Sequence, residues 1–199
     1  MAIKVLSECE SNIIDNLIRK GVNDAINGLS QMIGKDINLS SMSITNIPAR
    51  NIAMALGGAD TTIIGVYLAF SGPANGHIIL AHHPTVAFKL LDSLIGKKNS
   101  CLDLSELEQS ALGEVGNVTG TFFLNAVANA LNVVIHPSPP VVIIDMAGAI
   151  LDIAMVDILQ EGDEVSIVEA SYTIEDYGTN GTFLIILNRS FFDLPFLVK

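Results

Sequence analysis

The segment SALGEVGNVTG, from Ser110 to Gly120, places a carboxylate and an amide in a run with the periodicity of a helix. Each helical residue turns by about 100°, so residues separated by four, seven and eleven positions lie on one side. Ser110, Glu114, Asn117 and Thr121 have this spacing. We therefore expect a polar helix face whose two functional groups are the Glu114 carboxylate and the Asn117 amide.

The same run holds three glycines, Gly113, Gly116 and Gly120. Each costs about 1 kcal/mol relative to alanine inside a helix. A face that is only solvated would favour Ala, Lys or Glu. We expect the glycines to keep the exposed side low, so that another protein surface can dock there. A solvated face without function is the alternative, and spacing alone does not exclude it.

The helix carrying this face is expected to begin after Asp103 or Ser105 and to end near Asn132. Glu106 or Glu108, three residues past either cap, would complete a capping box. The residues predicted to face the core are Leu104, Leu107, Ala111, Val115, Val118 and Phe122.

The rest of the chain alternates helical and extended patterns. The expected helices are about Ile13–Ile33, capped by Gly34, then Pro84 to Gly96, and about Ala147–Gln160. Strands are expected at 37–44, in a hairpin of 61–70 with 77–83, and in a second hairpin of 164–174 with 181–188. Short apolar segments near 51–56 and in 133–145 complete the pattern.

An offset of 98 residues relates the two halves, setting Leu29–Ser40 against Val127–Ser138. Few aligned residues are identical, but the elements recur, so we favour an internal duplication with pseudo-repeats at about 10–100 and 101–199. Two such halves predict one α+β domain over residues 1–199, a mostly antiparallel sheet with long helices packed on it.

Composition narrows the partners. Half of the 199 residues are apolar and 16% are charged, which predicts a packed core. The net charge of −11 repels phosphate backbones and anionic lipid, so we expect neither nucleic acid nor membrane partners. The longest apolar window, 141–159, is interrupted by Asp145, Asp152 and Asp157, and the N-terminus lacks a signal pattern. Cys9 and Cys101 have no CxxC spacing, so a cytoplasmic protein with reduced thiols is expected.

The histidines do not predict a metal site. His82 and His83 are adjacent and would point apart, and no third ligand follows at a suitable spacing. We expect the pair to mark a strand end that leads into a helix at Pro84. His77 and His136 are isolated and are expected at the surface or in packing.

Ser110, Glu114, Asn117 and Pro140 fit a longer signature: Asp or Ser, three residues, Glu, two residues, Asn, twenty-two residues, Pro. This signature resembles that of the CheC/CheX/FliY family of chemotaxis phosphatases, and the resemblance covers most of the chain. It implies a CheC-like fold and hydrolysis of the aspartyl phosphate on a phosphorylated CheY-type response regulator.

The resemblance also implies residue roles. Asn117 would orient the attacking water, Glu114 would dock on the regulator's lysine, and Ser110 and Thr121 would line the contact. Pro140 would shape the neighbouring loop. Mg²⁺ would come from the regulator, so no cofactor of its own is expected. CheD is a further partner that the family implies, and a monomer is expected because a dimer would cover the glycine-lined face.

CheC-type proteins carry the signature twice. Aligned by the offset, Asn12, Asn16, Arg19 and Met42 stand at the first set of signature positions. A competing register uses Lys20 and Asn23 instead, and either way the first site is degenerate, as in one-site members. Two other functions stay open: an adaptor that binds phosphorylated CheY without turnover, and a FliY-type switch component, which we disfavour because the chain stops at Lys199. The sequence does not reveal which response regulator is the target.

Overall fold

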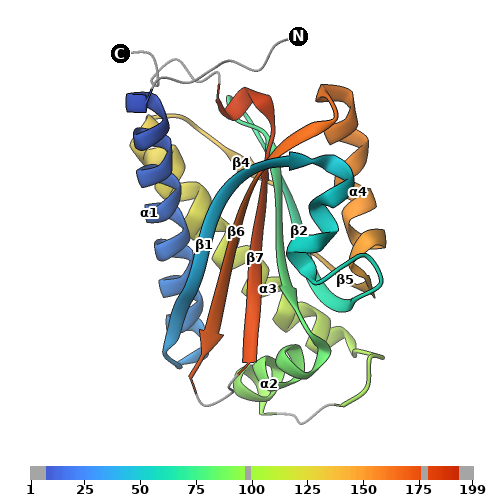
Figure 1. Cartoon of the computed structure of the whole chain (residues 1–199). Helices are drawn as coiled ribbons and strands as arrows, with labels where there is room; N and C mark the ends of the chain where they lie inside the picture. The colour runs from blue at the N-terminus through green and yellow to red at the C-terminus, as the bar shows by residue number, and fades with distance from the viewer. Residues whose placement is uncertain (1–7, 97–99, 176–178, 193–199) are drawn as a thin grey trace.

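One antiparallel sheet organises the molecule (Figure 1). The structure is a computed structural model and describes residues 8–96, 100–175 and 179–192. Within these residues the sheet has seven strands in the order β1-β6-β7-β3-β2, with β4 and β5 both paired to β2. The strands are β1 (Ile37–Pro48), β2 (Thr62–Ser71), β3 (Gly76–His82), β4 (His136–Pro137), β5 (Val141–Met146), β6 (Glu164–Ile174) and β7 (Thr179–Leu187).

Helices cover both faces of this sheet, so its central strands are buried on both sides. The long helices α1 (Glu8–Ile33) and α3 (Glu106–Leu131) pack on one face with α2 (Pro84–Ile95). The 3₁₀ segment η1 (Ala49–Leu56) and α4 (Ala147–Glu161) pack on the other face. The α+β class and the mostly antiparallel sheet are thereby confirmed.

Caps end the helices where the sequence predicts. Gly34 and Gly96 adopt left-handed φ values of 64° and 65°, and Asn132 adopts 51°. Of the two candidate caps for α3, Ser105 is used, and its backbone N–H donates to Glu108 Oε2 at 2.8 Å. His83 caps α2 and accepts a hydrogen bond from the Thr85 backbone, as expected for a strand that leads into a helix.

Apart from the two-residue strand β4, the sheet has the same order from either edge when equivalent elements of the two halves are exchanged. Replacing β1 by β5, β2 by β6 and β3 by β7 reverses the order β1-β6-β7-β3-β2-β5 and changes nothing else. α1 ends at Ile33 and α3 ends at Leu131, which are 98 positions apart. This arrangement suits a duplication, which stays a prediction.

Two expectations about elements are wrong. The first strand continues to Pro48 rather than ending at Ile44, because β6 pairs with it along that length. On α3, Leu107 and Phe122 were expected in the core but are 62% and 43% exposed. The buried side of α3 is instead formed by residues such as Leu112, Val115 and Phe123, because apolar residues occur all around this helix.

Candidate functional site on helix α3

The four predicted polar residues lie on the side of α3 that faces away from the sheet. Ser110 and Glu114 are exposed, and Asn117 and Thr121 are half-buried. The Asn117 amide Nδ2 donates a long hydrogen bond of 3.4 Å to Glu114 Oε2. The structure therefore brings the carboxylate and the amide together at an accessible surface, one helical turn apart.

This geometry leaves hydrogen-bonding positions open on both side chains. A carboxylate accepts several hydrogen bonds, so Glu114 can still receive a cation from a partner while it accepts from Asn117. The Asn117 amide keeps its carbonyl oxygen and a second N–H, so it can both accept from and donate to one molecule of water. The pair can dock on a positive group and orient a small polar molecule beside it.

The three glycines of α3 are not on this face. Gly113, Gly116 and Gly120 are buried against the sheet. A Cβ added to Gly116 would lie 2.3 Å from Cγ1 of Val66 in β2, whereas one on Gly120 would meet Leu68 at 3.6 Å. The expectation that the glycines keep the exposed side low is therefore wrong. They let the helix lie close to the sheet, because a side chain at Gly116 would collide with β2.

Pro140 lies under the same part of the helix. It directly precedes β5, and its Cγ would be 3.8 Å from a Cβ on Gly113, the residue before Glu114. The signature therefore combines three residues on the outer side of α3 with a proline that packs on its inner side.

An exposed leucine extends the polar face. Leu107 precedes Ser110 by three residues and Glu114 by seven, so it falls on the same side of α3. The apolar periodicity predicted that Leu107 faces the core, although its spacing from Glu114 is that of the polar face. Phe122 has a different role, since a Cβ on Gly28 of α1 would lie 2.5 Å from its ring, which shows that it packs on α1.

The corresponding positions of α1 do not repeat this arrangement. Asn12, Asn16 and Arg19 are exposed, but Arg19 Nε donates to Asp15 Oδ2 at 2.6 Å. That hydrogen bond and the charge of Asp15 raise the pKa of Arg19. α1 and α3 run in opposite directions (Figure 1), so the first halves of the two helices lie at opposite ends of the face.

The histidines and cysteines of the described residues form no metal site, and no described helix is a membrane span. In the part of the chain that the structure describes, no group of three or more His, Cys, Asp or Glu could hold a metal ion, and no helix is long and apolar enough to cross a bilayer. His136 is exposed, whereas His77 and His82 are buried. Cys101 is exposed, and the side chain of Cys9 lies outside the described part.

Comparison with known proteins connects the α3 segment to chemotaxis. The model of the CheC-like family matches residues 107–144, which contain Glu114, Asn117 and Pro140. The CheY-P phosphatase CheC of Bacillus subtilis strain 168 is 24% identical over 169 residues, which are 83% of this chain and 81% of that protein.

Two solved structures share the fold. FliY of Thermotoga maritima superposes with a TM-score of 0.72 at 20% identity, covering 96% of this chain and 93% of that one. The CheX-CheY-BeF3-Mg²⁺ complex of Borrelia burgdorferi gives 0.59 at 18% identity, covering 86% and 97%. These matches confirm the predicted resemblance to the CheC/CheX/FliY proteins and the CheC-like fold.

Proposed function

We propose that this protein stimulates hydrolysis of the aspartyl phosphate on a CheY-type chemotaxis response regulator. The observation that carries the proposal is the accessible pair of Glu114 and Asn117, held one turn apart on α3 inside the segment that the CheC-like family model matches. The name of the Bacillus subtilis relative, a CheY-P phosphatase, supports the same activity.

The chemistry asks for positioning more than for reactive side chains. Phosphoryl transfer passes through a loose transition state, so the rate depends mainly on an in-line water and on charge stabilisation. The regulator would supply Mg²⁺ and a lysine, and this chain would need no cofactor of its own. Asn117 orients the water, since its amide both accepts and donates. Glu114 pairs with the regulator's lysine and sets the depth of insertion.

The rest of the α3 face forms the contact. Ser110 and Thr121 line this contact. Leu107, two turns before Glu114, adds an apolar contact. The protein acts in the cytoplasm. It acts as a monomer, because a dimer through this face would cover Glu114 and Asn117. A CheD-type deamidase is a second partner that the resemblance implies.

The test mixes catalytic amounts of the protein with phosphorylated CheY and Mg²⁺ and follows loss of phosphate against autohydrolysis. Many turnovers per molecule are expected. Stoichiometric binding without acceleration would contradict the phosphatase and would support the adaptor function instead.

Asn117→Ala should lower the stimulated rate by at least about 100-fold while the complex still forms, because misplacing a reacting group costs about that much. Glu114→Ala should weaken binding as well as turnover. Asn129→Ala is the control, since Asn129 is an exposed asparagine on α3 that lies beyond the 110–121 face. Full activity in Asn117→Ala would show that the water is oriented by another group.

A further inference from the structure

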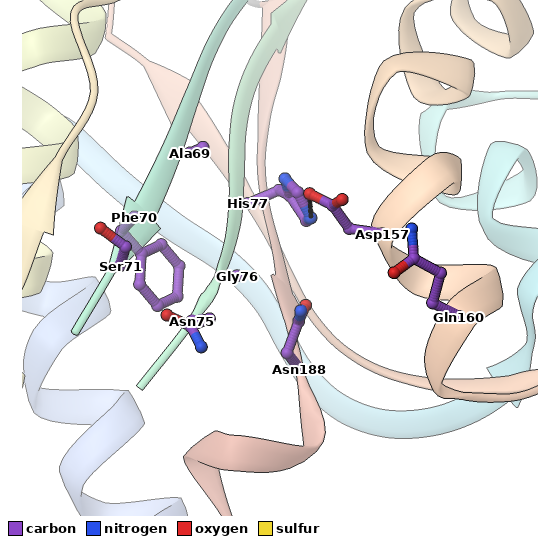
Figure 2. Close-up of a pocket in the computed structure, with 9 residues that line it drawn as sticks. All are labelled: Ala69, Phe70, Ser71, Asn75, Gly76, His77, Asp157, Gln160 and Asn188. Atoms are coloured by element: carbon purple, nitrogen blue, oxygen red, sulfur yellow. Dashed lines mark ion pairs between the residues drawn. The ribbon is translucent and has the colours of Figure 1, made fainter. Parts of the chain in front are cut away.

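A cavity of about 350 Å³ opens on the α4 side of the sheet, the face opposite α3 (Figure 2). The ends of β2 and β3 form its floor, the last turns of α4 form one wall, and the residue after β7 forms another. The residues that line it are Ala69, Phe70, Ser71, Asn75, Gly76, His77, Asp157, Gln160 and Asn188. None of the proposed phosphatase residues is among them.

A buried imidazole and a carboxylate face each other in this cavity. His77 is 3% exposed, and a hydrogen bond of 2.9 Å joins its Nδ1 to Tyr67 Oη. Its Nε2 lies 3.9 Å from Asp157 Oδ2 on α4, which is longer than a hydrogen bond (Figure 2). Tyr67 fixes the ring from one side, so Nε2 is directed toward Asp157 and the cavity.

The cavity also presents an acceptor without a donor. The Asn188 side-chain oxygen Oδ1 is buried and receives no hydrogen bond from the residues that the structure describes. Leaving a buried acceptor without a hydrogen bond costs free energy. Asp157 and Gln160, three residues apart on α4, bring further side-chain oxygens to the same wall. These acceptors therefore favour a ligand that donates hydrogen bonds.

Charge points to a cation. The lining contains Asp157 but no Lys or Arg. The C-terminal end of α4, where helix carbonyls accumulate negative potential, lies at the same wall and has no basic residue in its last turn. The chain as a whole carries a net charge of −11. Each of these features disfavours a phosphate or carboxylate ligand and favours a positive one.

We propose that this cavity binds a small organic cation through an ammonium group. A primary ammonium offers three N–H donors, which suits the Asp157 carboxylate and the Asn188 and Gln160 amide oxygens. The volume lies within the range of small-molecule sites and exceeds what a single metal ion would fill. The inference does not depend on the proposed phosphatase activity, because the cavity and the α3 face lie on opposite sides of the sheet.

Isothermal titration calorimetry with putrescine tests the proposal on the full chain at neutral pH. Putrescine should bind and the neutral analogue 1,4-butanediol should not. Asp157→Asn should weaken putrescine binding at least about tenfold, as expected for loss of a charge-assisted hydrogen bond. Asp152→Asn is the matched control, because Asp152 is exposed on the same helix and does not line the cavity. It should bind within about twofold of the unaltered protein, like other exposed charges remote from a site.

A second variant separates local binding from general attraction. Asn188→Ala keeps the net charge and should also weaken putrescine binding. Equal loss in Asp152→Asn and Asp157→Asn would show that the diamine is held only by the negative surface, which would overturn the site. No binding of putrescine at millimolar concentration would overturn it too. Tight binding of Zn²⁺ that putrescine cannot displace and that His77→Gln abolishes would assign the cavity to a metal instead.

Discussion

A buried hydrogen bond between His82 and Tyr172 lies inside the core at the end of β3. His82 Nε2 and Tyr172 Oη are 2.5 Å apart, and the rings meet edge to face at a centroid distance of 6.0 Å. Burial lowers the pKa of His82 to about 4 and raises the pKa of Tyr172. Both groups are therefore held neutral, and each satisfies a polar atom of the other that would be costly to bury alone.

This histidine should make stability depend on pH. In the unfolded chain His82 takes up a proton below about pH 6.5, whereas in the folded chain it does so only near pH 4. The contribution of neutral His82 to the free energy of unfolding is therefore fully present above pH 6.5 and declines as pH falls toward 4. At about 1.4 kcal/mol per pH unit, the contribution lost between pH 6.5 and 5 is about 2 kcal/mol.

Urea unfolding at pH 7.5 and 5.0, followed by circular dichroism, measures this loss. His82→Gln should lose less stability between the two pH values than the unaltered protein, because the titrating group is gone. His136→Gln, at an exposed histidine, should keep the original pH dependence. An unchanged pH dependence in His82→Gln would assign the acid sensitivity to other groups.

Single residues were predicted unevenly from the sequence. The role of His83 as the start of α2 follows from local signals, since Pro84 can only begin a helix and the preceding residue must be extended. The burial of His77 and His82 could not be predicted, because it depends on partners distant in sequence. His82 bonds Tyr172, ninety positions away, and His77 faces Asp157 on α4.

The approach of α3 to the sheet is the property of this element that matters most for the candidate site. Among the three glycines of α3, Gly116 lies closest to the sheet, because a Cβ there would lie 2.3 Å from Val66 Cγ1. The position is one residue from Asn117 and two from Glu114. Any side chain at Gly116 must push the helix outward or displace β2, and either change moves the two functional groups.

Gly116→Ala should therefore destabilise the fold by about 1–3 kcal/mol, the usual cost of overpacking a core. Gly113→Ala is the matched control, since its new Cβ would make only ordinary contacts, at 3.8 Å from Pro140. It should be neutral or stabilising, because alanine is preferred to glycine in a helix by about 1 kcal/mol. Thermal unfolding of both variants measures the difference.

Adding Val66→Ala to Gly116→Ala should recover part of the loss, because it removes the closest atom of the clash. Equal melting temperatures for Gly113→Ala and Gly116→Ala would show that the helix does not depend on this contact.

The sequence predicted well which helices and strands form and where the helices end. It predicted poorly which side of a helix faces the sheet. Gly34, Gly96 and Ser105 mark helix ends by local chemistry, and the structure uses all three. The glycines of α3 signalled a close approach, but their type does not say which side approaches. The sheet decides that, and the pairing of β2 with β5, which brings Pro140 beneath α3, is a contact between the two halves.

The whole molecule presents its polar sites on separate surfaces. The α3 face and the cavity beside α4 lie on opposite sides of the sheet, and the first half of α1 lies at the far end from the first half of α3. In the predicted duplication, α1 takes the place in the first half that α3 takes in the second.

The side chains of α1 and α3 predict one working site per chain. In the register set by the 98-residue offset, the Asn16 amide stands at the Glu position, and Arg19 Nε donates to Asp15 at 2.6 Å. In the competing register, Lys20 stands at the Glu position. The double variant Asn16→Ala, Arg19→Ala should therefore keep the stimulated loss of phosphate from CheY within about twofold of the unaltered protein, as expected for exposed residues away from the contact.

Calorimetry should accordingly find one phosphorylated regulator bound per chain, and none of this binding should depend on α1. A large loss of activity in the α1 variant, with Asn117→Ala still partly active, would show that the first half of the molecule contributes a second contact. The two halves would then share the function that their common order of elements suggests, rather than leaving it to α3.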